Sequence, residues 1–346
     1  MNYLTNMQAL ESFYLDSPHL DTLLKSFRGK KVGISGVSGF LGKNWANFFT
    51  ILNNRFDAKI CIYGFDISEG STWTSDPLYK FIKKDFTESL NFETKFDYFI
   101  HAASFASPMK YRQEPLATLH ANVSGFENCI EESKKGNIDR LILLSTSEIY
   151  GNPTPEHIPT IETYNGNVSC TGPRACYDES KRFAETLLWV NCNYYSLNAV
   201  AIRPFNVFGP GQSLSDGRIV PDLMRSLVNK EKFIMHSDGK PKRTFCFISD
   251  FIIGSLLTSV QGISGEAYNI GNDNPEISIK DLVLLLKSIE EFDFEFREST
   301  DKNYLVDNPL RRCPDISKVH NLTGWRPVVD LRRGLQITLD SYVAGY

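Results

Sequence analysis

The sequence of 346 residues lacks a long apolar run, an excess of basic residues and a signal-like N-terminus. No run approaches the roughly twenty apolar residues that a membrane-spanning helix needs, so we expect no membrane association. Lys and Arg number 37 against 41 Asp and Glu, a net charge of −4, which gives no reason to expect nucleic acid as a partner. Glu11 and Asp16 do not fit the charged-then-apolar layout of a secretory signal.

Paired cysteines and metal-ligand clusters are also missing. The seven cysteines include no Cys-x-x-Cys pair, and their odd number in a long chain argues for free thiols. We therefore expect a reducing, cytoplasmic compartment. No His-x-x-x-His pair or Cys/His cluster occurs, so we expect no metal site. The remaining composition, 42% hydrophobic and 23% charged, is typical of a globular protein with a large core.

What the sequence does have is a glycine motif between an expected strand and an expected helix. The apolar run 31–35 is followed by Gly36, Gly39 and Gly42, and apolar residues then recur at helical spacing. In a dinucleotide-binding turn, these three glycines would form the tight turn, the close approach to a pyrophosphate and the helix–strand packing. A plain glycine-rich turn would show the same residues, so the motif alone leaves both interpretations open.

The next expected strand favours the dinucleotide. The run 59–65 is apolar and ends at Asp66, at about the distance from the glycines where an acid binds the adenosine ribose. A carboxylate there would repel a 2′-phosphate, and no Arg follows Asp66 directly. The sequence therefore predicts NAD rather than NADP.

Further apolar runs alternate with helical stretches along the chain. We expect strands at 96–100, 140–146, 198–204 and 267–270, and helices at 112–135, 177–191 and 278–290. This alternation predicts an α/β fold, a Rossmann-type doubly wound parallel sheet with a smaller mixed α/β C-terminal substrate domain. Because ligands of such sheets bind beyond the carboxyl ends of the strands, the polar clusters 101–111, 145–148 and 206–218 are candidate site segments.

A tyrosine and a lysine lie four residues apart on the expected helix 177–191. Tyr177 and Lys181 would share one face of that helix. A lysine ammonium and a positive nicotinamide ring both favour phenolate, so we expect them to lower the pKa of Tyr177 and make it a base for an alcohol losing hydride. Thr146, at the end of strand 140–146, would share the substrate oxygen. The simpler alternative for Thr146 and Ser147 is strand-end capping.

In order and spacing, five features resemble the extended short-chain dehydrogenase/reductases that act on nucleotide sugars: GISGVSGFLG, Asp66, HAAS (101–104), STSEIYG (145–151) and YDESK (177–181). The resemblance covers roughly residues 28–342. Within that superfamily the chain most resembles the UDP-glucuronate decarboxylases, on the segments 104–115, 145–151, 172–182, 216–220 and 311–316.

The resemblance implies a role for each matching residue. The implied NAD-binding residues are Gly36, Gly39, Phe40, Leu41, Gly42, Asp66, Asp85, Phe86, Ala102, Ala103, Ser104, Asn122, Tyr177 and Lys181. The implied catalytic residues are Tyr177, Lys181, Thr146, Ser147 and Glu148. The implied substrate-binding residues are Tyr111, Asn206, Arg218, Arg243 and Arg312. Without the resemblance, Arg312 would be expected in a solvated charge pair, Arg243 in a surface ion pair and Tyr111 in the core. His101 is expected to be structural.

Apolar residues at helical spacing predict an N-terminal helical extension at 1–28, which lies outside the family pattern. For the rest of the chain we expect an NAD-binding Rossmann domain at 29–206, to which 244–272 return, and a nucleotide-sugar-binding domain at 207–243 and 273–346. In this superfamily the equivalents of the helices 112–135 and 177–191 form the four-helix bundle of a homodimer. The implied partners are therefore a nucleotide sugar, most readily a UDP-sugar, and a second copy of the chain.

Three reactions of the superfamily begin with hydride transfer from C4 of the sugar to NAD. A 4,6-dehydratase then needs an acid for the departing hydroxyl, and Ser147 is too weak an acid, which favours decarboxylation of UDP-glucuronate to UDP-xylose. A 4-epimerase of polysaccharide biosynthesis needs only a subset of these residues and stays open, as does a non-catalytic NAD-binding regulator. The chain departs from the usual decarboxylase pattern at Ser180, at Cys313 and in the segment 210–215.

Overall fold

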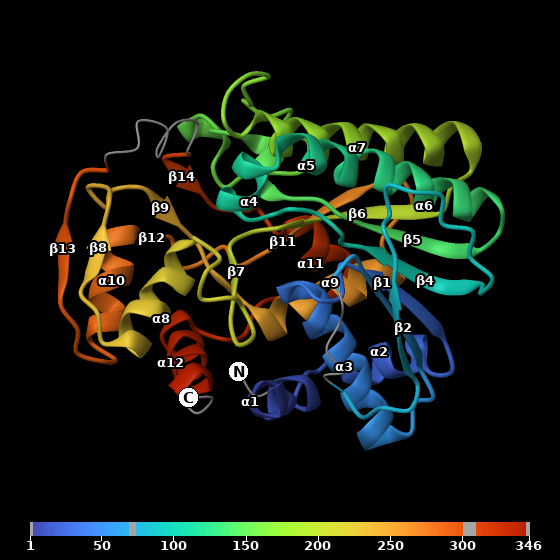
Figure 1. Ribbon diagram of the computed structural model, residues 1–346, viewed down its shortest axis with the longest axis horizontal. Coiled ribbons are helices and arrows are strands. Elements are labelled where there is room, and N and C mark those ends of the chain that lie inside the picture. The colour runs from blue at the N-terminus through green and yellow to red at the C-terminus, as the bar shows by residue number, and fades with distance from the viewer. Residues whose placement is uncertain (1–2, 69–73, 300–308, 344–346) are drawn as a thin grey trace.

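The computed structural model describes residues 3–68, 74–299 and 309–343, and a seven-stranded sheet lies at its centre (Figure 1). Its order is β11-β6-β5-β4-β1-β2-β3, and neighbouring strands are parallel. The strands are β1 (Lys31–Ser35), β2 (Cys61–Asp66), β3 (Tyr79–Lys83), β4 (Phe96–His101), β5 (Ile138–Leu144), β6 (Ala199–Pro204) and β11 (Ala267–Ile270). The direction of strand addition reverses between β1 and β4, so the expected doubly wound fold is confirmed and its switch point lies there.

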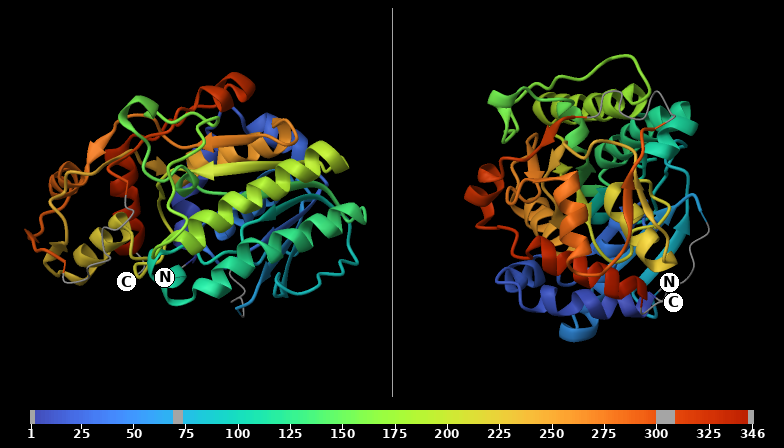
Figure 2. Two further views of the ribbon diagram at one scale, coloured as in Figure 1. Left: turned by 90° about the horizontal axis from the view of Figure 1, so that it is seen from above. Right: turned by 90° about the vertical axis from the view of Figure 1, so that its left-hand side faces the viewer.

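Helices cover both faces of the sheet (Figures 1 and 2). One face carries α5 (Pro115–Asn122), α6 (Ser124–Lys134) and α7 (Ala175–Tyr195), and the other carries α2 (Leu20–Phe27), α3 (Phe40–Phe56) and α9 (Ile248–Gln261). Because both faces are covered, the strands read as continuous apolar runs rather than as alternating ones. Val32 and Ile34 of β1 are fully buried.

The structure differs from the expectation at one helix and one strand. The helix expected over 112–135 is three helices, α4 (Pro108–Gln113), α5 and α6. Pro115 begins α5, and a proline has no N–H with which to continue the preceding helix. Strand β3, at the edge of the sheet, was not expected; its side chains are only half-buried or exposed, so it has no apolar run.

The N-terminal residues form α1 (Tyr3–Leu15) and α2, separated by a turn. Leu10 and Tyr14 of α1 and Leu23 and Phe27 of α2 are buried in the main core. The Phe27 ring lies 4.7 Å from that of Tyr98 on β4. These helices therefore pack on the same face of the sheet as α3 and α9. The domain boundaries given above stay a prediction.

A smaller lobe stands beside the carboxyl ends of the strands (Figure 2). Its helices are α8 (Ile219–Asn229), α10 (Ile279–Lys287) and α12 (Leu331–Val343), and α11 (Ser317–Thr323) packs against α9 and β11. Its strands are short and pair as β12-β9-β14 and β13-β8: β8 (Phe233–Met235), β9 (Lys242–Arg243), β12 (Ile277–Ser278), β13 (Phe294–Phe296) and β14 (Arg311–Arg312). The pair β7 (Val207–Phe208) and β10 (Cys246–Phe247) lies near the junction of the lobes. Among the described residues, no helix has the length and apolar character needed to cross a membrane.

Candidate active site

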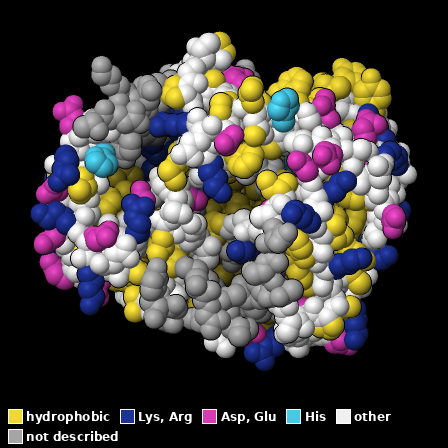
Figure 3. Space-filling model, in the orientation of Figure 1, with side chains coloured by type: hydrophobic (Ala, Val, Ile, Leu, Met, Phe, Trp, Pro, Cys, Tyr) yellow, Lys and Arg dark blue, Asp and Glu magenta, His cyan; other side chains and the backbone are white. Residues whose placement is uncertain are grey.

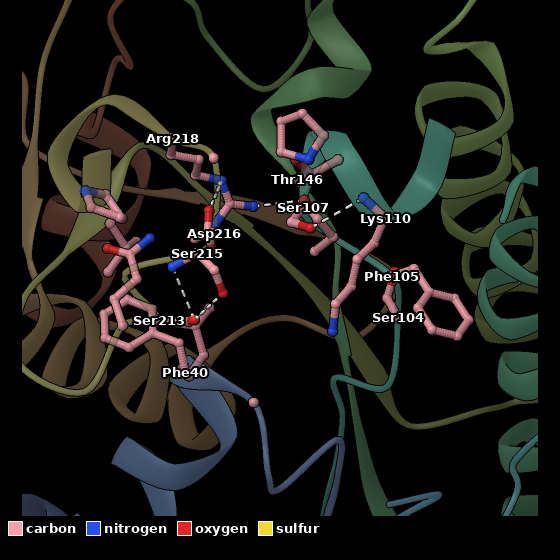
Figure 4. Close-up of a pocket in the computed structure, with 18 of the residues that line it drawn as sticks. Phe40, Ser104, Phe105, Ser107, Lys110, Thr146, Ser213, Ser215, Asp216 and Arg218 are labelled. Atoms are coloured by element: carbon pink, nitrogen blue, oxygen red, sulfur yellow. Dashed lines mark hydrogen bonds and ion pairs between the residues drawn. The ribbon is translucent and has the colours of Figure 1, made fainter. Parts of the chain in front are cut away.

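A cavity of about 1770 Å³ opens between the sheet and the smaller lobe. In Figure 3 this face is hollowed near its centre, and Lys and Arg side chains lie around the hollow. Figure 4 shows Asp216 and Arg218 on one side of the cavity, and Ser107 and Lys110 on the other. All the predicted site residues except Tyr111 and Asn122 line this one cavity.

The glycine turn forms a cradle that a side chain would fill. Gly36 has φ +70°, and a Cβ there would lie 2.8 Å from the Ala102 carbonyl oxygen. A Cβ on Gly42 would lie 2.3 Å from the Gly36 carbonyl oxygen, and one on Gly39 would lie 3.2 Å from it. Phe40 and Leu41 begin α3 directly behind this turn. The exposed N–H groups and the close backbone approach fit a dinucleotide pyrophosphate.

Asp66 ends β2 at the same edge of the cavity. Its Oδ2 accepts a hydrogen bond from the Ser38 N–H at 3.0 Å, and its Oδ1 accepts from the Ser68 N–H at 3.0 Å. Asp85 and Phe86 line the cavity beside it. This carboxylate at the end of the second strand fits an adenosine ribose, so the donor set agrees with NAD.

Ser35 and His101 hold the segment that follows β4. Ser35 Oγ accepts hydrogen bonds from the Ala102 and Ala103 N–H groups, both at 3.1 Å. His101 Nδ1 lies 3.0 Å from the same hydroxyl. Burial, with a smaller contribution from the charge of Lys181, lowers the pKa of His101 to about 3. The imidazole is therefore neutral near pH 7, and it positions Ala102, Ala103 and Ser104 along the cavity wall.

Tyr177 and Lys181 project from α7 into the cavity, where Thr146 hydrogen-bonds to Tyr177. Burial raises the pKa of Tyr177 to about 12, while the charge of Arg218 and the Thr146 hydrogen bond act in the opposite direction. Burial also lowers the pKa of Lys181 to about 7. Its Nζ donates to the Leu144 carbonyl at 2.8 Å. In the chain by itself desolvation outweighs the neighbouring charges, so Lys181 does not lower the pKa of Tyr177 there; the expected lowering with a positive nicotinamide bound stays a prediction.

Glu148 is the centre of a buried charge cluster. It lies in the short 3₁₀ helix η1 (Ser147–Tyr150), which Thr146 caps by accepting from the Glu148 N–H at 3.2 Å. Its Oε2 accepts hydrogen bonds from both Arg174 Nη2 and Arg312 Nη2. Burial alone would raise the pKa of Glu148, but the charges of Arg312 and Arg174 lower it to about 2. Glu148 is therefore ionised across the physiological range.

Arg243 approaches the same cluster from β9. Its guanidinium donates to the Lys242 and Pro309 carbonyls at 2.8 and 2.6 Å. Burial and the charge of Arg312 lower the pKa of Arg243 to about 9. These backbone contacts keep a guanidinium in the cavity wall, where an anion would be favoured.

Asn206 and Arg218 lie on the side of the smaller lobe. Asn206 has φ +41°, and its Nδ2 donates to the Thr244 carbonyl at 2.8 Å. Arg218 Nη2 donates to the Ala106 carbonyl at 2.7 Å, and its Nε lies 3.4 Å from Asp216 Oδ1. Arg218 thus spans the cavity from the segment before α8 to the segment before α4.

Tyr111 and Asn122 lie behind the cavity wall. The Tyr111 ring stacks on the Tyr177 ring with a centroid distance of 5.2 Å and an interplanar angle of 15°. Asn122 Nδ2 donates to Ser180 Oγ at 2.9 Å. The structure therefore gives both residues contacts with α7 rather than a position on the cavity surface.

Sequence reasoning missed Arg174 and Asp178. Arg174 lines the cavity, pairs with Glu148, and places its Nε 3.5 Å from Asp178 Oδ2. Both residues lie near Tyr177 in the segment 172–182, which carries part of the resemblance. Only the tertiary structure brings Glu148 into contact with Arg174. The one available signal was that a carboxylate at position 148 needs a buried cation partner.

Comparison with known proteins finds one family model, curated relatives and solved structures that match this chain. The model of the "NAD dependent epimerase/dehydratase family" matches residues 32–271. UDP-glucuronic acid decarboxylases 2 and 6 of Arabidopsis thaliana are 33% and 32% identical over 91% and 90% of this chain, and the matches cover 68% and 88% of those proteins. Among solved structures, the epimerase Mth375 of Methanothermobacter thermautotrophicus has a TM-score of 0.81 and 22% identity, covering 95% of this chain and 97% of that one.

The family match, the relatives and the cavity agree with one another. The matched residues include the glycine cradle, Asp66, the Tyr177–Lys181 pair and Glu148. The proteins that this chain resembles are enzymes, and the donor set at the glycine cradle and Asp66 fits the family's cofactor, NAD. The chain belongs to the NAD dependent epimerase/dehydratase family.

Proposed function

We propose that this protein decarboxylates UDP-glucuronate to UDP-xylose through a 4-keto intermediate. The proposal is supported by decarboxylase relatives that match 90–91% of the chain at 32–33% identity. The single observation that carries it is the pairing of Glu148 with both Arg174 and Arg312, in the cavity that also holds Tyr177.

The charge balance of this cluster suits a sugar that bears a carboxylate. Two guanidinium groups contact one ionised carboxylate, and Arg243 adds a third positive charge nearby. A buried excess of positive charge is costly unless an anion offsets it. The C6 carboxylate of a uronate supplies that anion, whereas an uncharged sugar substituent does not.

The residues of the chain divide the chemistry among them. The positive nicotinamide of bound NAD would lower the pKa of Tyr177. The Tyr177 phenolate would then take the proton of the C4 hydroxyl and return it when the ketone is reduced, while Thr146 hydrogen-bonds to the tyrosine and orients it. The glycine cradle and Asp66 would hold NAD, which would supply the acceptor for the C4 hydride and the source of its return. The resulting ketone is β to the C6 carboxylate, so carbon dioxide leaves, the electron pair moves into the enolate, and C5 then takes a proton. Arg312 and Arg174 hold Glu148 ionised beside this step.

A product assay with labelled substrate tests the proposal. The NAD-loaded protein is incubated with UDP-glucuronate labelled with ¹³C at C6, and gas and nucleotide products are analysed by mass spectrometry and NMR. We expect labelled carbon dioxide and an unlabelled UDP-pentose. A UDP-uronate of unchanged mass with inverted C4 would identify an epimerase and overturn the proposal, as would loss of water. Tyr177→Phe serves as the inactive control.

We also propose that the protein is a homodimer through α5 and α7. Phe183 and Tyr194 on α7 are 49% and 69% exposed, and Leu116 on α5 is 69% exposed. Phe183 and Tyr194 are eleven residues apart, which returns to nearly the same face of a helix. Large apolar side chains gathered on one helical surface are typical of an interface.

A further inference from the structure

We propose that Arg174 and Asp178 set the charge of the sugar pocket and thereby its preference for a carboxylate over an uncharged substituent. The inference rests on the proposed function, because it concerns how the same pocket chooses a uronate. Arg174 acts as a specificity-determining residue through Glu148, and Asp178 acts through Arg174.

Arg174 lies between Glu148 and the ring of Tyr111. It immediately precedes α7, and its side chain is 9% exposed. Its Nη2 donates to Glu148 Oε2, and its guanidinium lies 5.8 Å from the centre of the Tyr111 ring. Tyr111 in turn stacks on Tyr177. Arg174 therefore contacts the Glu148 carboxylate on one side and the Tyr111 ring, which lies behind Tyr177, on the other.

The net charge of the side chains around Glu148 depends on Arg174. Both Arg174 and Arg312 donate to Oε2, and no residue among those described donates to Oε1. Glu148, Arg174 and Arg312 by themselves sum to +1, and Arg243 adds a further positive charge nearby. This positive excess complements a substrate carboxylate. Without Arg174 the sum is zero, and Glu148 would hold Arg312 as a neutral pair. Arg312 would then be less available to an anion in the cavity.

Asp178 is the group that can change this sum. It is buried on α7, its Oδ2 faces Arg174, and its Oδ1 has no hydrogen-bond partner among the described residues. Arg174 and Asp178 also line a second, much smaller cavity of about 40 Å³. Ionisation of Asp178 would lower the net charge of the cluster from +1 to zero without any movement of the chain.

The titration of Asp178 falls in the physiological range. Burial, followed by the charge of Glu148, raises its pKa to about 7, against the opposing charges of Arg174 and Arg312. The charged groups around it are thus Glu148 of η1, Arg174 before α7 and Arg312 of β14, with the phenols of Tyr111 and Tyr177 neutral in this range. As the pH rises through this range, Asp178 ionises and the cluster loses its extra positive charge.

Binding of two matched ligands tests the inference. UDP-glucuronate and UDP-xylose share the nucleotide and differ by the carboxylate, so the ratio of their dissociation constants isolates the pocket charge. The ratio is measured by calorimetry on the NAD-loaded protein in a Tyr177→Phe background, which prevents turnover. We expect Arg174→Gln to weaken UDP-glucuronate about tenfold, the order expected for one unit charge several Å away, and to leave UDP-xylose within about twofold.

Two further variants separate charge from structure. Arg174→Lys keeps the charge and one donor, so it should retain most of the preference. Arg311→Gln is the matched control, because Arg311 adjoins Arg312 but pairs with Glu276 outside the cavity. It should leave both dissociation constants unchanged. Equal weakening of both ligands by Arg174→Gln, or no rescue by Arg174→Lys, would overturn the inference and leave the proposed function intact.

The pH dependence gives an independent readout. As the pH rises from 6 to 8, UDP-glucuronate should bind several-fold more weakly while UDP-xylose binding stays constant, and Asp178→Asn should abolish the difference. A difference that persists in Asp178→Asn contradicts the role of Asp178. If the parent protein binds neither ligand, the proposed function fails, and the inference fails with it.

Discussion

At the scale of single residues, burial governs the chemistry of the site more than sequence neighbours do. Lys181 lies one helical turn from Tyr177, yet desolvation raises the pKa of the tyrosine to about 12. Burial likewise lowers the pKa of Lys181 to about 7. Both groups are thus shifted toward their neutral forms, and a positive charge bound beside Tyr177 would move its pKa back down.

Removal of the Tyr177 hydroxyl should abolish turnover but not cofactor binding. A positioned general base contributes about 10²- to 10⁴-fold, so Tyr177→Phe should lower kcat by about that factor. NAD affinity, followed by calorimetry, should change little because the ring and its stack on Tyr111 remain. Tyr195→Phe, at an exposed position on the same helix, is the control. Substantial turnover by Tyr177→Phe would contradict the assigned role.

Gly36→Ala should lower the free energy of unfolding by more than the cost of a positive φ for alanine. Gly36→Ala adds a Cβ 2.8 Å from the Ala102 carbonyl oxygen at φ +70°. Gly136→Ala is the matched control, because it has φ +82° and a Cβ there meets nothing within 4 Å. The positive φ alone should cost about 1–2 kcal/mol in each variant. We expect Gly36→Ala to lose more stability by denaturant unfolding, and NAD affinity as well; equal losses would refute the close approach.

At the scale of elements, non-local contacts decide where helices end and which strands form. Pro115 divides one expected helix, and β3 forms at the sheet edge without an apolar run. Helix α9 shows the same dependence on distant residues. Asp250 in its first turn accepts a hydrogen bond from the Val329 N–H at 3.0 Å, which ties α9 to the segment before α12.

The burial of Asp250 predicts a pH-dependent stability, whereas the hydrogen bonds from the Val329 and Val328 N–H groups oppose the shift of its pKa. Burial raises the pKa of Asp250 to about 6, so the folded state binds the proton more tightly than the unfolded state. Stability from this group is therefore present at low pH and is lost as the pH rises from about 4 to 6. Asp250→Asn mimics the protonated form and should be more stable than the natural protein at pH 7, on the order of 2–3 kcal/mol.

The stability gap between Asp250→Asn and the natural protein should narrow as the pH falls below 6 and close below about pH 4. Urea unfolding at several pH values measures it, with Asp340→Asn, at an exposed position on α12, as the control. A gap that does not change with pH would show that Asp250 does not titrate as its burial requires.

At the scale of the whole molecule, the N-terminal helices join the two lobes. Helix α1 packs against α3 and α9 of the sheet layer and against α12 of the smaller lobe. The Phe13 ring lies 5.6 Å from that of Phe247, and Arg333 of α12 lies 4.9 Å above it. Glu11 forms an ion pair with Arg55 of α3 at 2.5 Å. The segment expected to be an extension thus contributes to the main core.

The proposed homodimer gives a prediction at this scale. Phe183→Glu combined with Tyr194→Glu places two charges on the exposed face of α7 and should convert the dimer to a monomer. Size-exclusion chromatography with light scattering measures the mass. Val328→Glu, at a 77% exposed position away from α7, should leave the dimer intact. A monomeric natural protein would rule out the proposed interface.

The sequence by itself determined the features that depend on residues close together in the chain. These are the strand 31–35, the glycine turn, Asp66 and the helical pair Tyr177–Lys181, because turn geometry and helical spacing are local properties. Fewer than half of the predicted site residues lie in these segments, and most of the others rest on the family resemblance. All but Tyr111 and Asn122 line the cavity.

Only the tertiary structure decided the charge and the protonation of the site. Glu148 meets Arg174 and Arg312 across 26 and 164 residues of chain. Tyr111 lies behind Tyr177 rather than beside the cavity because α4 packs there. Desolvation and the sum of neighbouring charges arise from packing between distant segments, and no local pattern contains them.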